Sequence, residues 1–156
     1  MANGSGYVTH SKKGIGDVAV DGLLAGMAAG VGMGVLLMAL GLIEGVGPFE
    51  LLGRFDPAGA KSAAVGGLLH LAVSGIYGVL FAIVYSVIRG RRPAANRYGA
   101  LIGATYGLML WLAAQYVFLP ELNSPLGEMS PLSFAAGHLA YGWILGQLLA
   151  RQRRDG

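Results

Sequence analysis

The chain has no cysteine among its 156 residues. This absence excludes disulfides, zinc sites with cysteine ligands, iron–sulfur clusters and a bacterial lipid-anchor cysteine. Charge is also scarce, because charged residues make up 12% of the chain against ~25% in typical soluble domains. The sequence shows no serine–histidine–aspartate set, no paired carboxylates within an apolar run and no phosphate-binding loop. We therefore predict a protein that is not an enzyme.

What the chain does contain is apolar and glycine-rich. Hydrophobic residues make up 54% of it, and glycine occurs 27 times. The mean hydropathy is +0.59. Small residues let apolar helices approach each other closely in a membrane. The composition therefore predicts tightly packed membrane helices.

Four stretches carry no charged residue: 22–43, 62–88, 98–120 and 129–150. A helix needs about 20 residues to cross a bilayer, and each stretch is at least that long. They are too long and too uniformly apolar for barrel strands. We predict one all-α domain over 1–156, a polytopic four-helix membrane bundle with helices at about 18–43, 62–89, 97–119 and 131–151. We take the first apolar run as a retained span, because it is too long for a signal peptide.

The basic residues predict the orientation. All but two of the 11 lysine and arginine residues fall on one side of the four spans. By the positive-inside rule both termini are cytoplasmic, in a bacterial inner membrane. We expect anionic lipids as partners on this side, and no nucleic acid, because no aromatic residues lie between the arginines. The basic set is Lys12, Lys13, Arg89, Arg91, Arg92, Arg97, Arg151, Arg153 and Arg154, against Arg54 and Lys61 opposite.

The chain also predicts an internal repeat, with halves at about 17–89 and 95–152. Each half has a run of glycines four residues apart, then an outer loop with proline and glutamate, then a helix with a histidine. Two spans in each copy preserve orientation, so this is a parallel tandem duplication of a helical hairpin. The first glycine ladder is Gly22, Gly26 and Gly30, the second is Gly99, Gly103 and Gly107, and the histidines are His70 and His138.

The two ladders predict how the helices pack. Residues four apart share one helix face, so three such glycines make a flat groove. We expect the two ladders to face each other, which places the first and third spans together at the centre. The second and fourth spans would then flank this pair.

The two histidines have three interpretations. The favoured one is structural: a neutral ring hydrogen-bonds across a helix interface, to Ser74, Gln115, a tyrosine or a backbone carbonyl. The second is bis-imidazole ligation of a b-type haem by His70 and His138. The central-pair prediction argues against haem ligation, because a central pair would hold the two histidine helices too far apart to bind one iron. The third is a proton or solute path, for which the core offers few further polar steps. We expect no cofactor, with haem b as the alternative.

The outer loop 45–61 contains the sequence PFELLGRF. Its apolar residues fit two arrangements equally, an amphipathic turn in the membrane interface or a loop packed over the end of the bundle.

Residues Gly137, His138, Tyr141, Gly142, Leu145 and Gly146 form the pattern G-H-x-x-Y-G-x-x-L-G. This pattern resembles the last helix of a family of uncharacterised bacterial inner-membrane proteins. The resemblance implies four spans with a histidine in the second and the fourth, and it implies no activity. Together these features predict an accessory subunit of a larger membrane complex, for example a respiratory or photosynthetic one. The alternatives are a bis-histidine haem b electron carrier and a small proton or solute transporter.

Overall fold

The computed structural model describes residues 14–122 and 125–152, and this part of the chain is helical, with no strand. The predicted all-α class is therefore confirmed. The elements are α1 (Ile15–Ile43), α2 (Pro48–Gly53), α3 (Ala63–Arg91), the 3-10 helix η1 (Pro93–Tyr98), α4 (Gly99–Ala113), the π-helical segment η2 (Ala114–Phe118), α5 (Leu119–Leu122), the 3-10 helix η3 (Pro125–Glu128) and α6 (Pro131–Arg151).

Local chemistry accounts for the helix ends. Ser62 precedes α3, and its hydroxyl accepts a hydrogen bond from the backbone N–H of Val65 at 3.4 Å, a typical N-cap. The same helix ends at Arg91, two residues before Pro93, which cannot continue it. Pro131 occupies the first turn of α6, where its missing N–H costs nothing.

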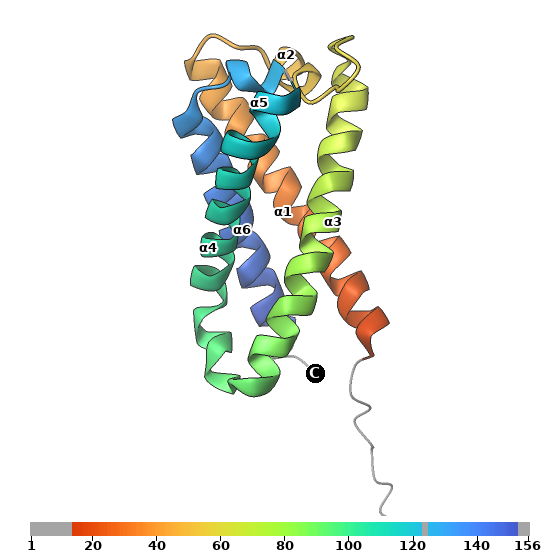
Figure 1. Ribbon diagram of the computed structural model, residues 1–156, viewed down its shortest axis with the longest axis vertical. Coiled ribbons are helices and arrows are strands. Elements are labelled where there is room, and N and C mark those ends of the chain that lie inside the picture. The colour runs from red at the N-terminus through yellow and green to blue at the C-terminus, as the bar shows by residue number, and fades with distance from the viewer. Residues whose placement is uncertain (1–13, 123–124, 153–156) are drawn as a thin grey trace, which may run out of the picture.

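Two hairpins make up the bundle. In the first, α1 packs on α3, and in the second, α4 packs on α6. The hairpins meet where α1 packs along α6, and α1 runs diagonally across the bundle (Figure 1). The segments 44–62, 119–122 and 125–130 lie at the upper end in that view, and the turn at 92–98 lies at the lower end.

The prediction of a central pair made by the two ladders is wrong. The first ladder faces α3 instead of α4. A methyl group added at Gly22 would lie 2.6 Å from the Ala82 Cβ, and one at Gly26 would lie 2.5 Å from the Ser74 carbonyl oxygen. One at Gly30 would lie 2.5 Å from the Ser74 Oγ. These glycines therefore let two backbones within one hairpin approach each other.

The second ladder faces α6 in the same way. A methyl group at Gly99 would lie 2.7 Å from the Ala150 Cβ, and one at Gly103 would strike the carbonyl oxygen of Gly142. Each histidine helix supplies the complementary small residues, again four apart. That pairing fixes the partner of each ladder. The partners are Ser74, Gly78 and Ala82 in α3, and Gly142, Gly146 and Ala150 in α6.

The contact between hairpins uses larger side chains. Leu37 of α1 is fully buried and packs against Gly137 of α6, where an added methyl group would lie 2.8 Å from its Cδ2. Ile144 of α6 packs in turn over Gly32 of α1. Knob-like side chains over glycines thus join α1 to α6.

Among the described residues, three helices are long and apolar enough to cross a membrane: Ile15–Ile43, Ala63–Arg91 and Pro93–Phe118. The range predicted for the fourth span is present as α6, a helix of 21 residues. The arginines at 89, 91, 92, 97 and 151 border the turn at 92–98 and the end of α6. The predicted basic residues Lys12, Lys13, Arg153 and Arg154 lie outside the described residues.

One side of the outer loop 45–61 packs on the bundle, and the other side is exposed. In α2, Leu51 is buried, whereas Phe49 is exposed. Asp56 is also buried, and its carboxylate accepts hydrogen bonds from the backbone N–H groups of Ala58 and Ser62, both at 3.0 Å. These bonds hold the loop over the end of α3.

Candidate functional site

Both predicted histidines line one cavity of about 330 Å³. We call this space the histidine cavity. It lies in the half of the bundle that contains α2 and α5, and its walls come from α1, α3, α6 and the segment 110–119. Apolar and aromatic side chains form most of the wall. Two separate helices thus bring their imidazoles to a single apolar space.

His70 is held by a bond across the first hairpin. Its Nε2–H donates to the carbonyl oxygen of Gly30, at 2.9 Å. Its ring lies against Phe55, with 4.8 Å between ring centroids. On the surface between α1 and α3 the same ring borders an apolar groove, so His70 separates this groove from the histidine cavity.

His138 is held within its own helix. Its Nδ1–H donates to the carbonyl oxygen of Phe134, one turn earlier in α6, at 2.9 Å. The Phe134 ring meets the imidazole edge-on, with centroids 4.5 Å apart and an interplanar angle of 83°. The turn from Phe134 to His138 therefore holds the ring by both a hydrogen bond and a ring contact.

The next residue on each ladder face explains why the two histidines differ. Four residues after Gly30 comes Gly34, and an added methyl group there would lie 3.8 Å from His70 Nε2. Four residues after Gly107 comes Trp111, a large ring on the equivalent face of α4. The Trp111 indole nitrogen is buried and has no hydrogen-bond partner among the described residues, so packing alone holds this ring. Trp111 in the second hairpin thus takes the ladder position that Gly34 has in the first.

The two bonds fix the chemistry that each ring offers. A carbonyl oxygen only accepts, so each bonded ring nitrogen must carry the proton. In a neutral imidazole the other nitrogen is then a hydrogen-bond acceptor. His70 therefore offers Nδ1 as an acceptor, and His138 offers Nε2.

Two tyrosines tie the walls of the cavity together. Tyr141 of α6 lines it, and its hydroxyl donates to the carbonyl oxygen of Ser74 at 2.6 Å. Tyr106 of α4 donates similarly to the carbonyl oxygen of Tyr77 at 3.0 Å. Both bonds end on α3, so they hold the second hairpin against the first.

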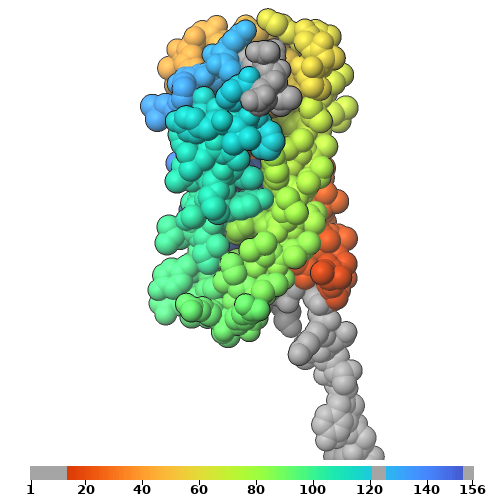
Figure 2. All heavy atoms as spheres, viewed as in Figure 1, coloured from red at the N-terminus to blue at the C-terminus, as the bar shows by residue number. Residues whose placement is uncertain are grey.

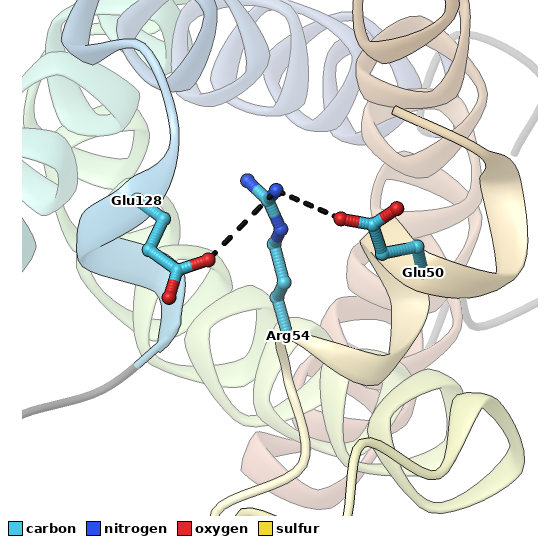
Figure 3. A network of polar contacts seen from close by, with 3 residues as sticks. All are labelled: Glu50, Arg54 and Glu128. Carbon is cyan, nitrogen blue, oxygen red and sulfur yellow. Dashed lines mark hydrogen bonds and ion pairs between the residues drawn. The ribbon is translucent and has the colours of Figure 1, made fainter. Parts of the chain in front are cut away.

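Polar contacts fasten the outer loops above the cavity. Arg54, whose side chain is only 11% exposed, lies between Glu50 and Glu128, as Figure 3 shows. Its guanidinium is 3.1 Å from the Glu50 carboxylate and 3.9 Å from that of Glu128. The loop residues Phe55 and Leu126 line the cavity just below. Arg54 thus joins the two loops that carry this part of the wall.

The cavity opens between α3 and the segment that follows α4. Leu69, Val73 and Phe118 line it and are also 39%, 37% and 50% exposed. Figure 2 shows α3 and α4 on the same face of the molecule. The π-helical segment η2 carries Phe118 at this opening. The mouth therefore faces the apolar flank of the bundle.

A protein-family model matches residues 16–155. The chain belongs to DUF6789, a family of unknown function. The matched range takes in the histidine cavity and both hairpins of this DUF6789 chain. Membership of an uncharacterised family, predicted from the last helix, is thereby confirmed. No curated protein and no solved structure matches the chain.

The structure places the other predicted residues away from the cavity wall. The six ladder glycines of this DUF6789 chain lie in the contacts within hairpins, although Gly30 presents its carbonyl to His70. Among the partners proposed for the histidines, the backbone carbonyl is the one observed. In the described residues no group of three or more histidine, aspartate or glutamate side chains is placed to hold a metal.

Sequence reasoning missed the aromatic part of the wall. Phe55 and Phe134 flank the two imidazoles, and Tyr141 closes the space between them. A signal for two of them was present, since Phe134 and Tyr141 lie four residues before and three after His138 and so share its helix face. Nothing local in the sequence marked Phe55, which arrives from the outer loop.

Proposed function

We propose that the chain is a four-span inner-membrane protein with both termini in the cytoplasm, built from two copies of one hairpin. The length of α6, the three apolar helices and the arginines gathered at one end support this topology. Because the chain lacks cysteine, a single introduced cysteine reports its own location. Ala60→Cys, in the outer loop, should react with an impermeant maleimide on intact cells. Ala94→Cys, in η1, should react only after the cells are opened, and the reverse result would exclude this topology.

We infer that the protein binds an apolar molecule taken from the bilayer into the histidine cavity. The observation that carries this proposal is the convergence of both imidazoles on one apolar cavity. Its volume, about 330 Å³, lies within the range of small-molecule sites, ~300–1,000 Å³. Such sites combine an apolar wall with a few placed polar groups, and here His70 and His138 are those groups.

The mouth of the cavity supports entry from the membrane. Its exposed residues are Leu69, Val73 and Phe118, on helices that are apolar enough to span a bilayer. A water-soluble ligand would have to pass the outer loops joined by Arg54. An apolar ligand would instead pass between α3 and η2 without leaving hydrocarbon.

Extraction of the purified protein tests this function. Protein isolated in native-lipid nanodiscs is extracted with solvent, and bound apolar molecules are identified by mass spectrometry. In Ala114→Phe the new ring would fill part of the cavity and displace the ligand. The matched control is Ala72→Phe, because Ala72 is exposed on α3. Equal recovery from both variants, or no enriched molecule in the wild type, would refute ligand binding.

An accessory role in a larger membrane assembly is the second candidate, and the exposure of α4 favours it. Only 11% of the span window in 93–118 is buried, against 33% in each of the spans of α1 and α3. This leaves an apolar helix face for a neighbouring subunit. Purification from native membranes in mild detergent should then recover a larger complex, and a homogeneous monomer would argue against this role.

Haem b remains an alternative with one chemical difficulty. A bis-histidine haem takes one nitrogen from each ring while the other donates to the protein. His138 already has this form, with Nδ1–H bonded and Nε2 available. His70 has its Nε2 hydrogen-bonded to Gly30. It would have to bind iron through Nδ1, or its ring would have to flip and break this bond. A Soret band lost in both His70→Ala and His138→Ala would support the haem protein.

A further inference from the structure

We propose that the histidine cavity selects molecules that carry hydrogen-bond donors at both ends of a flat apolar head, as an aromatic diol of the hydroquinone class does. This inference rests on the proposed ligand-binding function and names its ligand class. The juxtaposition that carries it is two imidazoles, each with one nitrogen already committed to a backbone carbonyl, on one apolar cavity.

The two hydrogen bonds already present dictate the polarity of the site. The carbonyl oxygens of Gly30 and Phe134 each accept a hydrogen bond from an imidazole N–H, so neither ring has a second N–H while it is neutral. Each ring can then only accept a hydrogen bond from a ligand. A ligand with hydroxyl groups satisfies both acceptors, whereas one with carbonyl or ether oxygens places acceptor against acceptor.

The other polar groups on the wall do not reverse this preference. The Tyr141 hydroxyl already donates its one hydrogen bond to the Ser74 carbonyl. The Ser74 and Tyr77 hydroxyls can each accept as well as donate, so they tolerate either kind of ligand. The bias towards donors therefore comes from the two histidines.

The shape of the wall favours a flat head with an apolar tail. Phe55 packs against one imidazole and Phe134 against the other, so aromatic faces and edges border both polar positions. Rings pack well against such surfaces in offset or edge-on geometry. The exposed Leu69, Val73 and Phe118 at the mouth would contact a tail that extends into the bilayer.

A matched set of probes tests donor selection on the full chain in nanodiscs. The probes are 2-decyl-1,4-hydroquinone, its dimethyl ether and the corresponding quinone, with oxygen excluded. They share one skeleton, and only the first donates hydrogen bonds. Binding is followed by the rise in unfolding temperature and by the ¹⁵N signals of labelled histidine. We expect the hydroquinone to bind at least tenfold more tightly than the ether or the quinone, and to shift the signals of Nδ1 in His70 and Nε2 in His138.

Variants test whether the preference for the hydroquinone comes from the histidine rings. His138→Phe keeps a ring of similar size without the acceptor, so the hydroquinone should lose most of its advantage over the ether. Thr105→Val is the control, because Thr105 is exposed and its hydroxyl donates to the Leu101 carbonyl within α4. This variant should retain the full preference.

The outcomes separate the two proposals. If the three probes bind equally well to the wild type, donor selection is wrong while ligand binding stands. If none of them binds and nothing apolar co-purifies, ligand binding itself fails. The wild-type probe comparison decides the question even if His138→Phe does not fold.

Discussion

The two hairpins use the same contact and differ in what surrounds it. In both, glycines four apart on one helix face small residues four apart on the other, so the backbones touch. In the first hairpin α1 is also covered by α6, whereas α4 has α6 as its main partner and remains largely exposed. The shared contact therefore holds each hairpin together, and the contact between α1 and α6 brings one helix of each hairpin to the centre of the bundle.

The same comparison extends to the histidines. His70 reaches across to α1 because Gly34 leaves room, and His138 bonds within its own helix, in the hairpin that has Trp111 at the position of Gly34. The two rings are therefore protonated at different nitrogens, Nε2 in His70 and Nδ1 in His138. Two hairpins with the same glycine contact thus hold their histidines in different ways.

The largest expected effect comes from replacing a ladder glycine with a large side chain. Gly26→Leu and Gly103→Leu would each drive a side chain into the backbone of the partner helix, at Ser74 and at Gly142. We expect each to lower the free energy of unfolding by about 3 kcal/mol, at the upper end for overpacking. Reversible unfolding in mixed detergent micelles measures this loss.

The control for this pair is Gly90→Leu, in the last turn of α3, where nothing lies within 4 Å of an added methyl group. It should leave stability unchanged or slightly raised, since glycine is a poor helix former. A loss confined to one of the two hairpins would show that their contacts are not equivalent.

The next effect sharpens the difference between the histidines. Gly34→Leu should occupy the space of the His70 ring and break its bond to Gly30, at a cost of about 1.5 kcal/mol for a buried group left without its partner. Solid-state ¹⁵N spectra of the wild type should show His70 protonated at Nε2 and His138 at Nδ1. In the variant only the His70 signals should change.

Val20→Leu, an exposed position on α1, controls for added bulk and should leave both rings as they are. Should His70 keep a protonated Nε2 bonded to Gly30 in Gly34→Leu, the explanation from space on the ladder face is wrong.

A smaller effect concerns the bond that joins the hairpins behind the cavity. Tyr141→Phe removes the hydroxyl that donates to Ser74, and the expected loss is about 1 kcal/mol of unfolding free energy. Tyr116→Phe is the matched control, because Tyr116 is exposed on η2. Equal stability of the two variants would mean that the 2.6 Å bond contributes nothing net.

The smallest effect lies at the outer loops. Arg54→Met keeps the stem of the side chain and removes its pairs with Glu50 and Glu128, and we expect a loss of about 0.5 kcal/mol because both carboxylates are exposed. Thermal unfolding at low and high salt measures it. A salt-independent difference from the wild type would show that packing of the stem, rather than charge, is responsible.

Composition was sufficient to predict the long helices, although not the short ones such as α2. Uncharged stretches of span length and the proline at 131 marked the elements to within a few residues, and α6 begins and ends where it was expected. The exception is the third predicted helix, which the structure divides into α4 and the π-helical η2. Hydrophobic periodicity does not distinguish a π-turn from the α-helix around it.

The partners of the ladders could not be read from the ladders alone. A flat glycine face predicts that another helix packs closely against it, and it does not identify which helix. The missing signal lay on the histidine helices, where Ser74 and Gly78 in α3 correspond to Gly142 and Gly146 in α6. Matching these small residues to the nearest ladder would have predicted the hairpins. The approach of Phe55 to His70, by contrast, depends on the path of a loop.

The π-helical turn at Ala114–Phe118 has a consequence for how the cavity wall is aimed. A π-turn accommodates one more residue than an α-turn, and each residue of an α-helix adds about 100° of rotation. Deleting a single residue there would restore regular α-winding and leave Phe118 and Leu119 pointing in the same direction, whereas deleting one residue from α4 would rotate them by about 100° about the helix axis. The π-turn therefore takes up its extra residue locally, and neither the glycine contacts of α4 nor the direction of the cavity wall depends on that residue.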